Sequence, residues 1–252
     1  MLQADVRVVT RGQRSGSRSR RREEKARSIL AAAMRQFARA GYHRARVEDI
    51  AAELSIAKGS VFQHFGDKET LFLAAYKQAV SSFSRYLDAP PEVLAQGFFA
   101  TLAYWLERTE QLLRENWVPY RLVLIGNYAS DLTLRREINR FLVTEDPYGA
   151  IPFVKMGIER GELRGDVDPE LLVSILEWTV ERFQDALLTE ELDPGLFRQP
   201  RGRPDRVRAR KEQFLRVLES ALAARSKGSP RRGRTERAAP GRRPRRRESR
   251  HR

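Results

Sequence analysis

The order of apolar and polar residues between positions 26 and 77 predicts a series of short amphipathic helices. Apolar residues recur there at helical spacings, first in the stretch that holds Ile29 and Phe37. A second stretch with Val47 and Ile50 is separated from a third by a short turn. Three such helices bury one small core between them, an arrangement typical of helix-turn-helix proteins.

Glycine, serine and aspartate mark the expected ends of these helices. Gly41 is expected to end the first helix in a left-handed conformation. Ser55, Ile56 and Ala57 form the turn before the third helix, and Asp67 is expected to cap a fourth helix that begins at residue 68. This fourth helix would connect the three-helix unit to the rest of the chain.

The stretch from 23 to 84 resembles the DNA-binding domain of the TetR family. The matching residues are Phe37, Gly41, Tyr42, Val47, Ile50, Ala51, Ile56, Lys58, Gly59, Phe62, His64, Phe65, Lys68 and Leu71. The resemblance implies an all-α homodimer, with an N-terminal helix-turn-helix domain and a larger helical domain. It also implies a repressor that binds a palindromic operator and releases it when a small molecule enters the larger domain.

Three positions depart from the family pattern. Ser55 stands where glycine is usual in the turn, Ala57 where a Ser or Thr usually caps the third helix, and Arg46 where a Thr often caps the second. A lost cap costs about 1 kcal/mol, which is too little to unfold the domain. Because the missing hydroxyls also contact phosphate in the family, we expect Arg46 to take over that contact.

The third helix is expected to lie in the major groove of DNA. Gln63 can form a paired hydrogen bond with adenine, Ser60 can reach several base edges, and Lys58 can reach guanine or phosphate. His64 and Lys68 are expected at backbone phosphates. The expected DNA-binding residues are Tyr42, Arg46, Lys58, Gly59, Ser60, Gln63, His64 and Lys68.

The pattern after Pro91 predicts a second helical region. Its expected helices span about 92–114, 118–129, 131–161 with an interruption at 147–152, 169–190 and 205–225. By resemblance, the last two helices pair with their copies in a homodimer. The expected interface residues are Ile175, Thr179, Phe183, Phe214, Leu218 and Leu222. The alternative is that both apolar stripes are buried inside the monomer.

Aromatic residues are frequent in this second region. Six of them are candidates for binding an effector: Tyr104, Trp105, Trp117, Tyr120, Tyr128 and Trp178. Because ligand pockets are mostly apolar with a few polar groups, these residues favour a mainly hydrophobic effector of unknown identity. The alternative is that they are ordinary core residues.

The net charge of +15 is concentrated at the two ends of the chain. Residues 227–252 hold twelve Lys or Arg against two acids, and residues 1–28 hold nine against three. We expect a basic disordered arm over 1–22, a helix-turn-helix domain over 23–84 with the motif at about 46–65, an effector and dimerisation domain over 91–226, and a basic disordered tail over 227–252. A rival interpretation is a non-specific, architectural nucleic-acid-binding protein that binds through these basic ends.

The sequence offers little chemistry for an enzyme. It has no cysteine, three histidines and no glycine-rich phosphate loop, so we expect no catalytic site, cofactor or metal. No apolar stretch approaches the roughly 20 residues that cross a membrane. We therefore expect a cytoplasmic protein whose partners are double-stranded DNA, a small molecule and a second copy of the chain.

Overall fold

The computed structural model describes residues 10–86 and 88–224, and within them the chain is all-helical, as the sequence predicts. The N-terminal part consists of α1 (Thr10–Arg44), α2 (Val47–Glu53), α3 (Lys58–Phe65) and α4 (Lys68–Tyr86). It is followed by α5 (Pro91–Leu94), α6 (Phe98–Glu115), α7 (Trp117–Asn127), α8 (Leu132–Glu145), α9 (Ala150–Glu159), α10 (Pro169–Leu188), a 3-10 turn (Glu190–Leu192) and α11 (Pro204–Leu222). Among the helices in these ranges, none is both long enough and apolar enough to cross a membrane.

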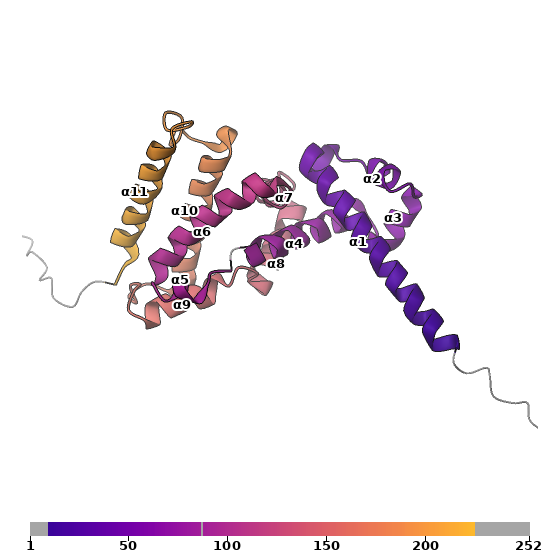
Figure 1. Cartoon of the computed structure of the whole chain (residues 1–252), viewed down its shortest axis with the longest axis horizontal. Coiled ribbons are helices and arrows are strands. Elements are labelled where there is room, and N and C mark those ends of the chain that lie inside the picture. The colour runs from indigo at the N-terminus through magenta and orange to yellow at the C-terminus, as the bar shows by residue number, and fades with distance from the viewer. Residues whose placement is uncertain (1–9, 87, 225–252) are drawn as a thin grey trace, which may run out of the picture.

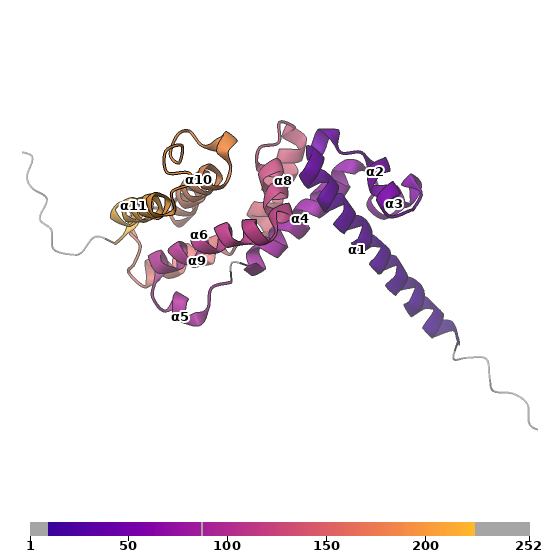
Figure 2. The ribbon, with the colours of Figure 1, turned by 45° about the horizontal axis from the view of Figure 1, so that its top comes forward.

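The molecule is elongated, with α2 and α3 at one end and α10 and α11 at the other (Figures 1 and 2). The first core lies between α1, α2, α3 and α4, where Ile29, Phe37, Ile50 and Val61 are fully buried. The same core continues into α7 and α8. The helix-turn-helix unit is therefore packed directly onto the second region.

α1 differs from the sequence expectation at both of its ends. It begins at Thr10, so the expectation of a disordered arm is wrong for residues 10–22, which are helical. Arginine is a good helix former, and the segment adds turns to a helix that the core already stabilises. Residues 1–9 of the expected arm, and the expected tail over 227–252, lie outside the described residues. At the other end, Gly41 has a positive φ of 76° but a ψ of 168°, and the helix resumes after this kink up to Arg44.

The turn between α2 and α3 follows the expected chemistry. Ser55, where the family has glycine, adopts a positive φ of 53°. Arg46 and Ala57 stand at the N-caps of α2 and α3 without a side-chain cap. Asp67 caps α4, because its Oδ1 accepts a hydrogen bond of 2.7 Å from the backbone N–H of Thr70. α2 and α3 therefore lack side-chain caps, as predicted, and the core holds both helices without them.

The helices of the second region agree with the prediction in order but not in every boundary. The helix expected over 92–114 is two helices, α5 and α6, because Gly97 takes a φ of 104° between them. The carboxylate of Glu162 accepts a hydrogen bond from the backbone N–H of Phe98 and so caps α6. The expected cap of α10 at Asp168 is confirmed, because Oδ1 of Asp168 accepts a hydrogen bond of 2.9 Å from the backbone N–H of Glu170.

α4 and α7 approach each other closely at Gly126. A methyl group on Gly126 would lie 2.5 Å from Cε2 of the buried Tyr76 ring. Only glycine permits this approach. α4, which begins directly after the α3 segment, is thus fixed against the middle of the second region.

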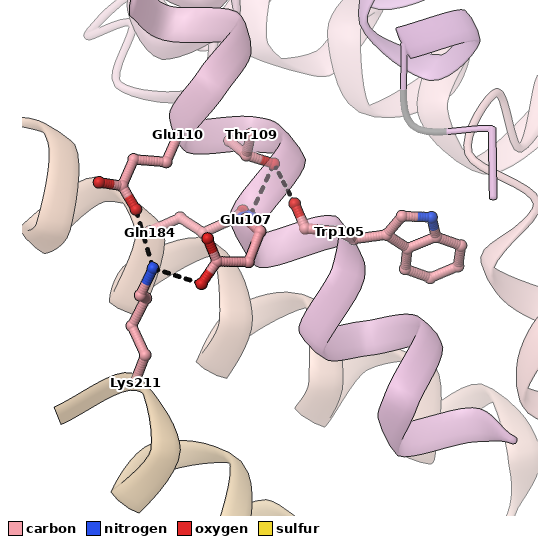
Figure 3. A network of polar contacts seen from close by, with 6 residues as sticks. All are labelled: Trp105, Glu107, Thr109, Glu110, Gln184 and Lys211. Carbon is pink, nitrogen blue, oxygen red and sulfur yellow. Dashed lines mark hydrogen bonds and ion pairs between the residues drawn. The ribbon is translucent and has the colours of Figure 1, made fainter. Parts of the chain in front are cut away.

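Within the second region, ionic and polar contacts hold α6 against α10 and α11 (Figure 3). Lys211 on α11 donates hydrogen bonds of 2.7 and 2.9 Å to the carboxylates of Glu107 and Glu110 on α6. Gln184 on α10 donates one of 3.0 Å to the hydroxyl of Thr109. Burial alone would lower the pKa of Lys211, but the two carboxylates more than offset it and leave that pKa raised. The Trp105 ring points away from this network (Figure 3).

Candidate nucleic-acid interface

α3 presents polar side chains outward and packs its apolar side chains against the first core. Val61 is fully buried in the first core, whereas Lys58, Gly59 and Gln63 are exposed and Ser60 is partly exposed. No atom comes within 4 Å of a methyl group placed on Gly59, so nothing in the monomer requires glycine there. The outward face of α3 therefore consists of groups that can form hydrogen bonds with a partner.

Lys58 is already engaged within the protein. Its Nζ lies 2.7 Å from Oε1 of Glu48 on α2 and 5.4 Å from the centre of the Phe62 ring. The hydrogen bond from Lys58 lowers the pKa of the Glu48 carboxyl. Both groups are about half exposed, so water weakens this pair and a phosphate or base can compete for the lysine.

Tyr42 and Lys68 form a second group, at the junction of α1 and α4. The Nζ of Lys68 donates a hydrogen bond of 3.0 Å to the backbone carbonyl of His43 and lies 5.0 Å from the centre of the Tyr42 ring. Burial lowers the pKa of Lys68 and raises that of Tyr42. Lys68 therefore has a structural role, because it binds a backbone carbonyl in the last turn of α1, in addition to any contact with DNA.

Arg46 and His64 complete the expected DNA-binding set. Arg46 is exposed just before α2. His64 is partly buried in the last turn of α3, and burial together with the positive charges of Arg22 and Lys25 lowers its pKa. The basic residues of α1 thus lie close enough to affect the end of α3.

The six expected effector residues lie in several places rather than around one cavity in the described part of the chain. Tyr120 and Tyr128 meet, because their hydroxyls donate hydrogen bonds of 2.9 and 2.7 Å to the two oxygens of Asp185. Trp105 packs on Phe153, with 4.5 Å between ring centres, and Tyr104 is partly exposed on the same helix. Trp117 and Trp178 are 49% and 65% exposed. These two tryptophans therefore lie on the surface of the protomer and do not line a cavity inside it.

A polar network that sequence reasoning did not identify joins α4, α7 and α10. The Tyr76 hydroxyl donates a hydrogen bond of 3.1 Å to Oδ1 of Asn127, and Nδ2 of Asn127 donates to Glu181. Burial, and then the neighbouring Asp185, raise the pKa of Glu181 to about 7. Carboxylates at positions 177, 181 and 185 recur every four residues of a mostly apolar helix, a pattern that places them on one face and could have revealed the network.

The expected dimer residues divide into buried and accessible ones. Phe183, Leu218 and Leu222 are buried inside the protomer, whereas Ile175, Thr179 and Phe214 are only partly buried. The rings of Phe183 and Phe214 stack with 3.8 Å between their centres and join α10 to α11. Phe183, Leu218 and Leu222 therefore follow the alternative expectation, which is burial inside the monomer.

The outer face of α10 and α11 carries exposed apolar residues and an open groove. Leu171, Trp178 and Val217 are 49%, 65% and 66% exposed. Val217 also lines the groove, together with other residues of α10, α11 and the intervening loop, among them Arg182, Leu196 and Gln213. An exposed apolar area of this kind is typical of a surface that binds a partner.

Comparisons with known proteins agree with this architecture. Residues 29–75 match the family described as bacterial regulatory proteins, tetR family. The HTH-type transcriptional regulator RutR of Escherichia coli K12 is 36% identical over 174 residues, which are 68% of this chain and 79% of RutR. The HTH-type transcriptional repressor AcnR of Corynebacterium glutamicum is 29% identical over 170 residues, covering 67% of this chain and 84% of AcnR.

A solved structure shares the fold. FadR of Bacillus subtilis, in complex with stearoyl-CoA, superposes with a TM-score of 0.56 at 22% identity, over 77% of this chain and 97% of FadR. The helix-turn-helix unit, the all-helical second region and the 36% identity to RutR lead to one assignment. The chain is a member of the tetR family of bacterial regulatory proteins, helix-turn-helix regulators of transcription.

Proposed function

We propose that the protein represses transcription by binding a palindromic operator as a homodimer, and that a mainly hydrophobic small molecule releases it. The observation that carries the proposal is the outward face of α3, where Ser60 and Gln63 extend from a helix anchored by the buried Val61. A helix held in this way can enter the major groove and read base edges. The protein would act on DNA in the cytoplasm.

The expected DNA-binding residues divide into two roles in this proposal. Lys58, Ser60 and Gln63 contact base edges, and Gly59 allows the backbone of α3 to approach the duplex closely. The remaining residues contact phosphates: Tyr42, Arg46, His64 and Lys68. Phosphate contacts fix the orientation of the reader, and base contacts supply its specificity.

The dimer in this proposal forms through the outer face of α10 and α11. Trp178 moves from the effector set to the interface, because its side chain is exposed, as are those of Leu171 on the same helix and Val217 on α11. Ile175, Thr179 and Phe214 lie partly accessible on the same two helices and belong to the interface as well. A twofold dimer requires such a self-complementary surface, and a second copy would cover the exposed rings and methyl groups.

The effector in this proposal acts near the contact of α4 with α7. Tyr120 and Tyr128 are tied to Asp185, and Tyr76 of α4 is tied through Asn127 to Glu181. A ligand that rearranges these helices would move α4 and with it the spacing of the two readers, provided that it binds the two spacings with different affinity. FadR, which has this fold, binds stearoyl-CoA, so the fold can accept a ligand with a long apolar chain.

The experiment is selection of random duplexes by the purified full-length protein at near-physiological salt. The proposal predicts enrichment of a palindrome with half-sites separated by about one helical turn or a multiple of it. Enrichment of no sequence would overturn it. The comparisons do not favour the rival, a non-specific architectural protein, and that rival predicts binding that depends steeply on salt and hardly on sequence.

Release is tested on the selected operator. Addition of hydrophobic compounds to the operator complex should identify at least one that dissociates the complex and changes the tryptophan fluorescence. The fluorescence signal is expected because Trp105 and Trp117 lie on α6 and α7, next to the proposed region of movement. A compound that releases the operator without any change in the fluorescence would contradict the placement of the effector.

A further inference from the structure

The N-terminal part of α1 projects beyond the helices that cover the rest of it (Figures 1 and 2). The described side chains from Arg20 to Lys25 are all exposed, and the fully buried face begins at Ile29. The described side chains of this segment are therefore not covered by the core of the protomer and are accessible to a partner.

The exposed segment carries a basic stripe in line with the apolar stripe of the core. Lys25 and Arg22 precede Ile29 by four and seven residues, so all three lie on one face of the helix. Arg20 and Arg27 occupy the opposite face. One face of α1 thus changes from apolar, where it meets α2, α3 and α4, to positively charged beyond them.

The basic stripe faces the side of the molecule where α3 ends. The positive charges of Arg22 and Lys25 help to lower the pKa of His64 in the last turn of α3, which places them near that turn. Neither Arg22 nor Lys25 forms an ion pair with any of the residues that the structure describes. Two positive charges beside the reading helix, without a carboxylate partner, are complementary to a phosphate backbone that continues past α3.

We propose that this N-terminal segment of α1 lies along the DNA that flanks each half-site, with Arg22 and Lys25 on backbone phosphates. The proposal rests on the operator-binding function and extends it to a partner surface outside the helix-turn-helix motif. The helix from Thr10 to Ile29 is about 28 Å long, enough to follow at most about eight base pairs. Since phosphates carry no base identity, the contact adds affinity and salt dependence but no sequence preference.

The test compares two double variants of the full chain that lose the same charge. Arg22→Gln with Lys25→Gln removes the stripe, and Arg20→Gln with Arg27→Gln removes two charges from the opposite face. Affinity is measured against salt concentration for a duplex with about ten flanking base pairs on each side and for one trimmed to the two half-sites. We expect the stripe variant to bind the long duplex at least about tenfold more weakly, with a salt slope lower by about two per protomer. The opposite-face variant should stay close to the wild type.

Equal losses in both variants, or an equal loss on the trimmed duplex, would overturn the proposal. Glutamine is a good helix former and all four residues are exposed, so both variants should keep the circular dichroism and melting temperature of the wild type. A scrambled duplex of the same length as the long duplex separates the proposed operator function from the proposed contact of the basic stripe with phosphates. A wild type without sequence preference contradicts the operator function, while the difference between the variants on that scrambled duplex still shows whether the stripe contacts phosphate.

Discussion

Gln63 is the residue of α3 with the greatest capacity to distinguish one base from another, because its amide can donate and accept at the same base edge. Its side chain is exposed and outside the protein core. We expect Gln63→Ala to relax the preference at one base position per half-site, by about 1–3 kcal/mol of discrimination. Lys68→Ala should instead lower the affinity for all duplexes by similar factors.

Selection of random duplexes by each variant makes the comparison. Gln78→Ala, which changes an exposed glutamine on α4 outside the reader, is the matched control and should select the wild-type operator. The assignment of roles would be wrong if Lys68→Ala changed the selected sequence and Gln63→Ala did not.

We expect Glu181 to make the stability of the protein depend on pH. Burial and Asp185 raise its pKa from 4.5 in an exposed carboxyl to about 7, so the folded state binds more protons than the unfolded state between these values. The free energy of unfolding therefore falls as the pH rises from about 4.5 to 7, and the full cost of the buried charge remains above pH 7. The raised pKa of Asp185 acts in the same direction.

We expect Glu181→Gln to reduce this slope and to stabilise the protein above pH 7, because glutamine can still accept the hydrogen bond from Asn127. Urea denaturation at pH 5, 6, 7 and 8 measures the effect. Glu159→Gln, at an exposed carboxyl of α9, serves as the control. A slope that is the same in Glu181→Gln and in the wild type would show that Glu181 does not titrate in this range.

At the scale of elements, the contact of α4 with α7 joins the reader to the second region. Gly126 lies against the ring of Tyr76, which is buried and held by Asn127 and so has little room to move. We expect Gly126→Ala to lower the free energy of unfolding by about 1–3 kcal/mol through overpacking. Chemical denaturation checks this value.

Gly59 is the control for Gly126, because it lies in a helix but has open space around it. A methyl group there meets nothing in the monomer, so Gly59→Ala should leave the stability unchanged or raise it by up to about 1 kcal/mol. If α3 approaches DNA closely, the same variant should bind the operator more weakly. Equal destabilisation by the two substitutions would contradict the close packing of α4 on α7.

The sequence predicted most elements because their signals are local. The apolar spacing of α1 to α4, the cap at Asp67 and the pair Asp168 and Pro169 act within a few residues of each other. The break before α6 occurs at Gly97, and it was missed because Glu162, whose carboxylate caps α6 there, is distant in sequence. The network of Glu181 was missed for the same reason, since its partners come from three helices.

At the scale of the whole molecule, sequence reasoning left open which side of the last two helices faces outward. Amphipathic stripes identify apolar faces, but they do not show which face a neighbouring helix covers. The structure buries Phe183 and Leu218 in the protomer and leaves Trp178 and Val217 exposed. The exposed pair, which the spacing pattern alone did not single out, defines the proposed dimer surface.

We expect Val217→Glu to shift the protein from dimer to monomer in sedimentation velocity and to lower its affinity for a palindromic duplex. A carboxylate buried without a partner at the twofold interface would be strongly unfavourable. Val143→Glu is the matched control, because Val143 is 80% exposed on α8, away from this surface. Dissociation by both variants, or by neither, would place the interface elsewhere.

The most direct test of the central claim is the ratio of affinities for the selected operator and for a scrambled duplex of equal length, measured at physiological salt with the full-length protein. If α3 reads base edges in a dimer, the ratio should be about 10³ or more and should persist as salt increases. A ratio close to one, with affinity that falls steeply with salt for both duplexes, would mean that the basic segments alone bind DNA and that α3 reads no sequence.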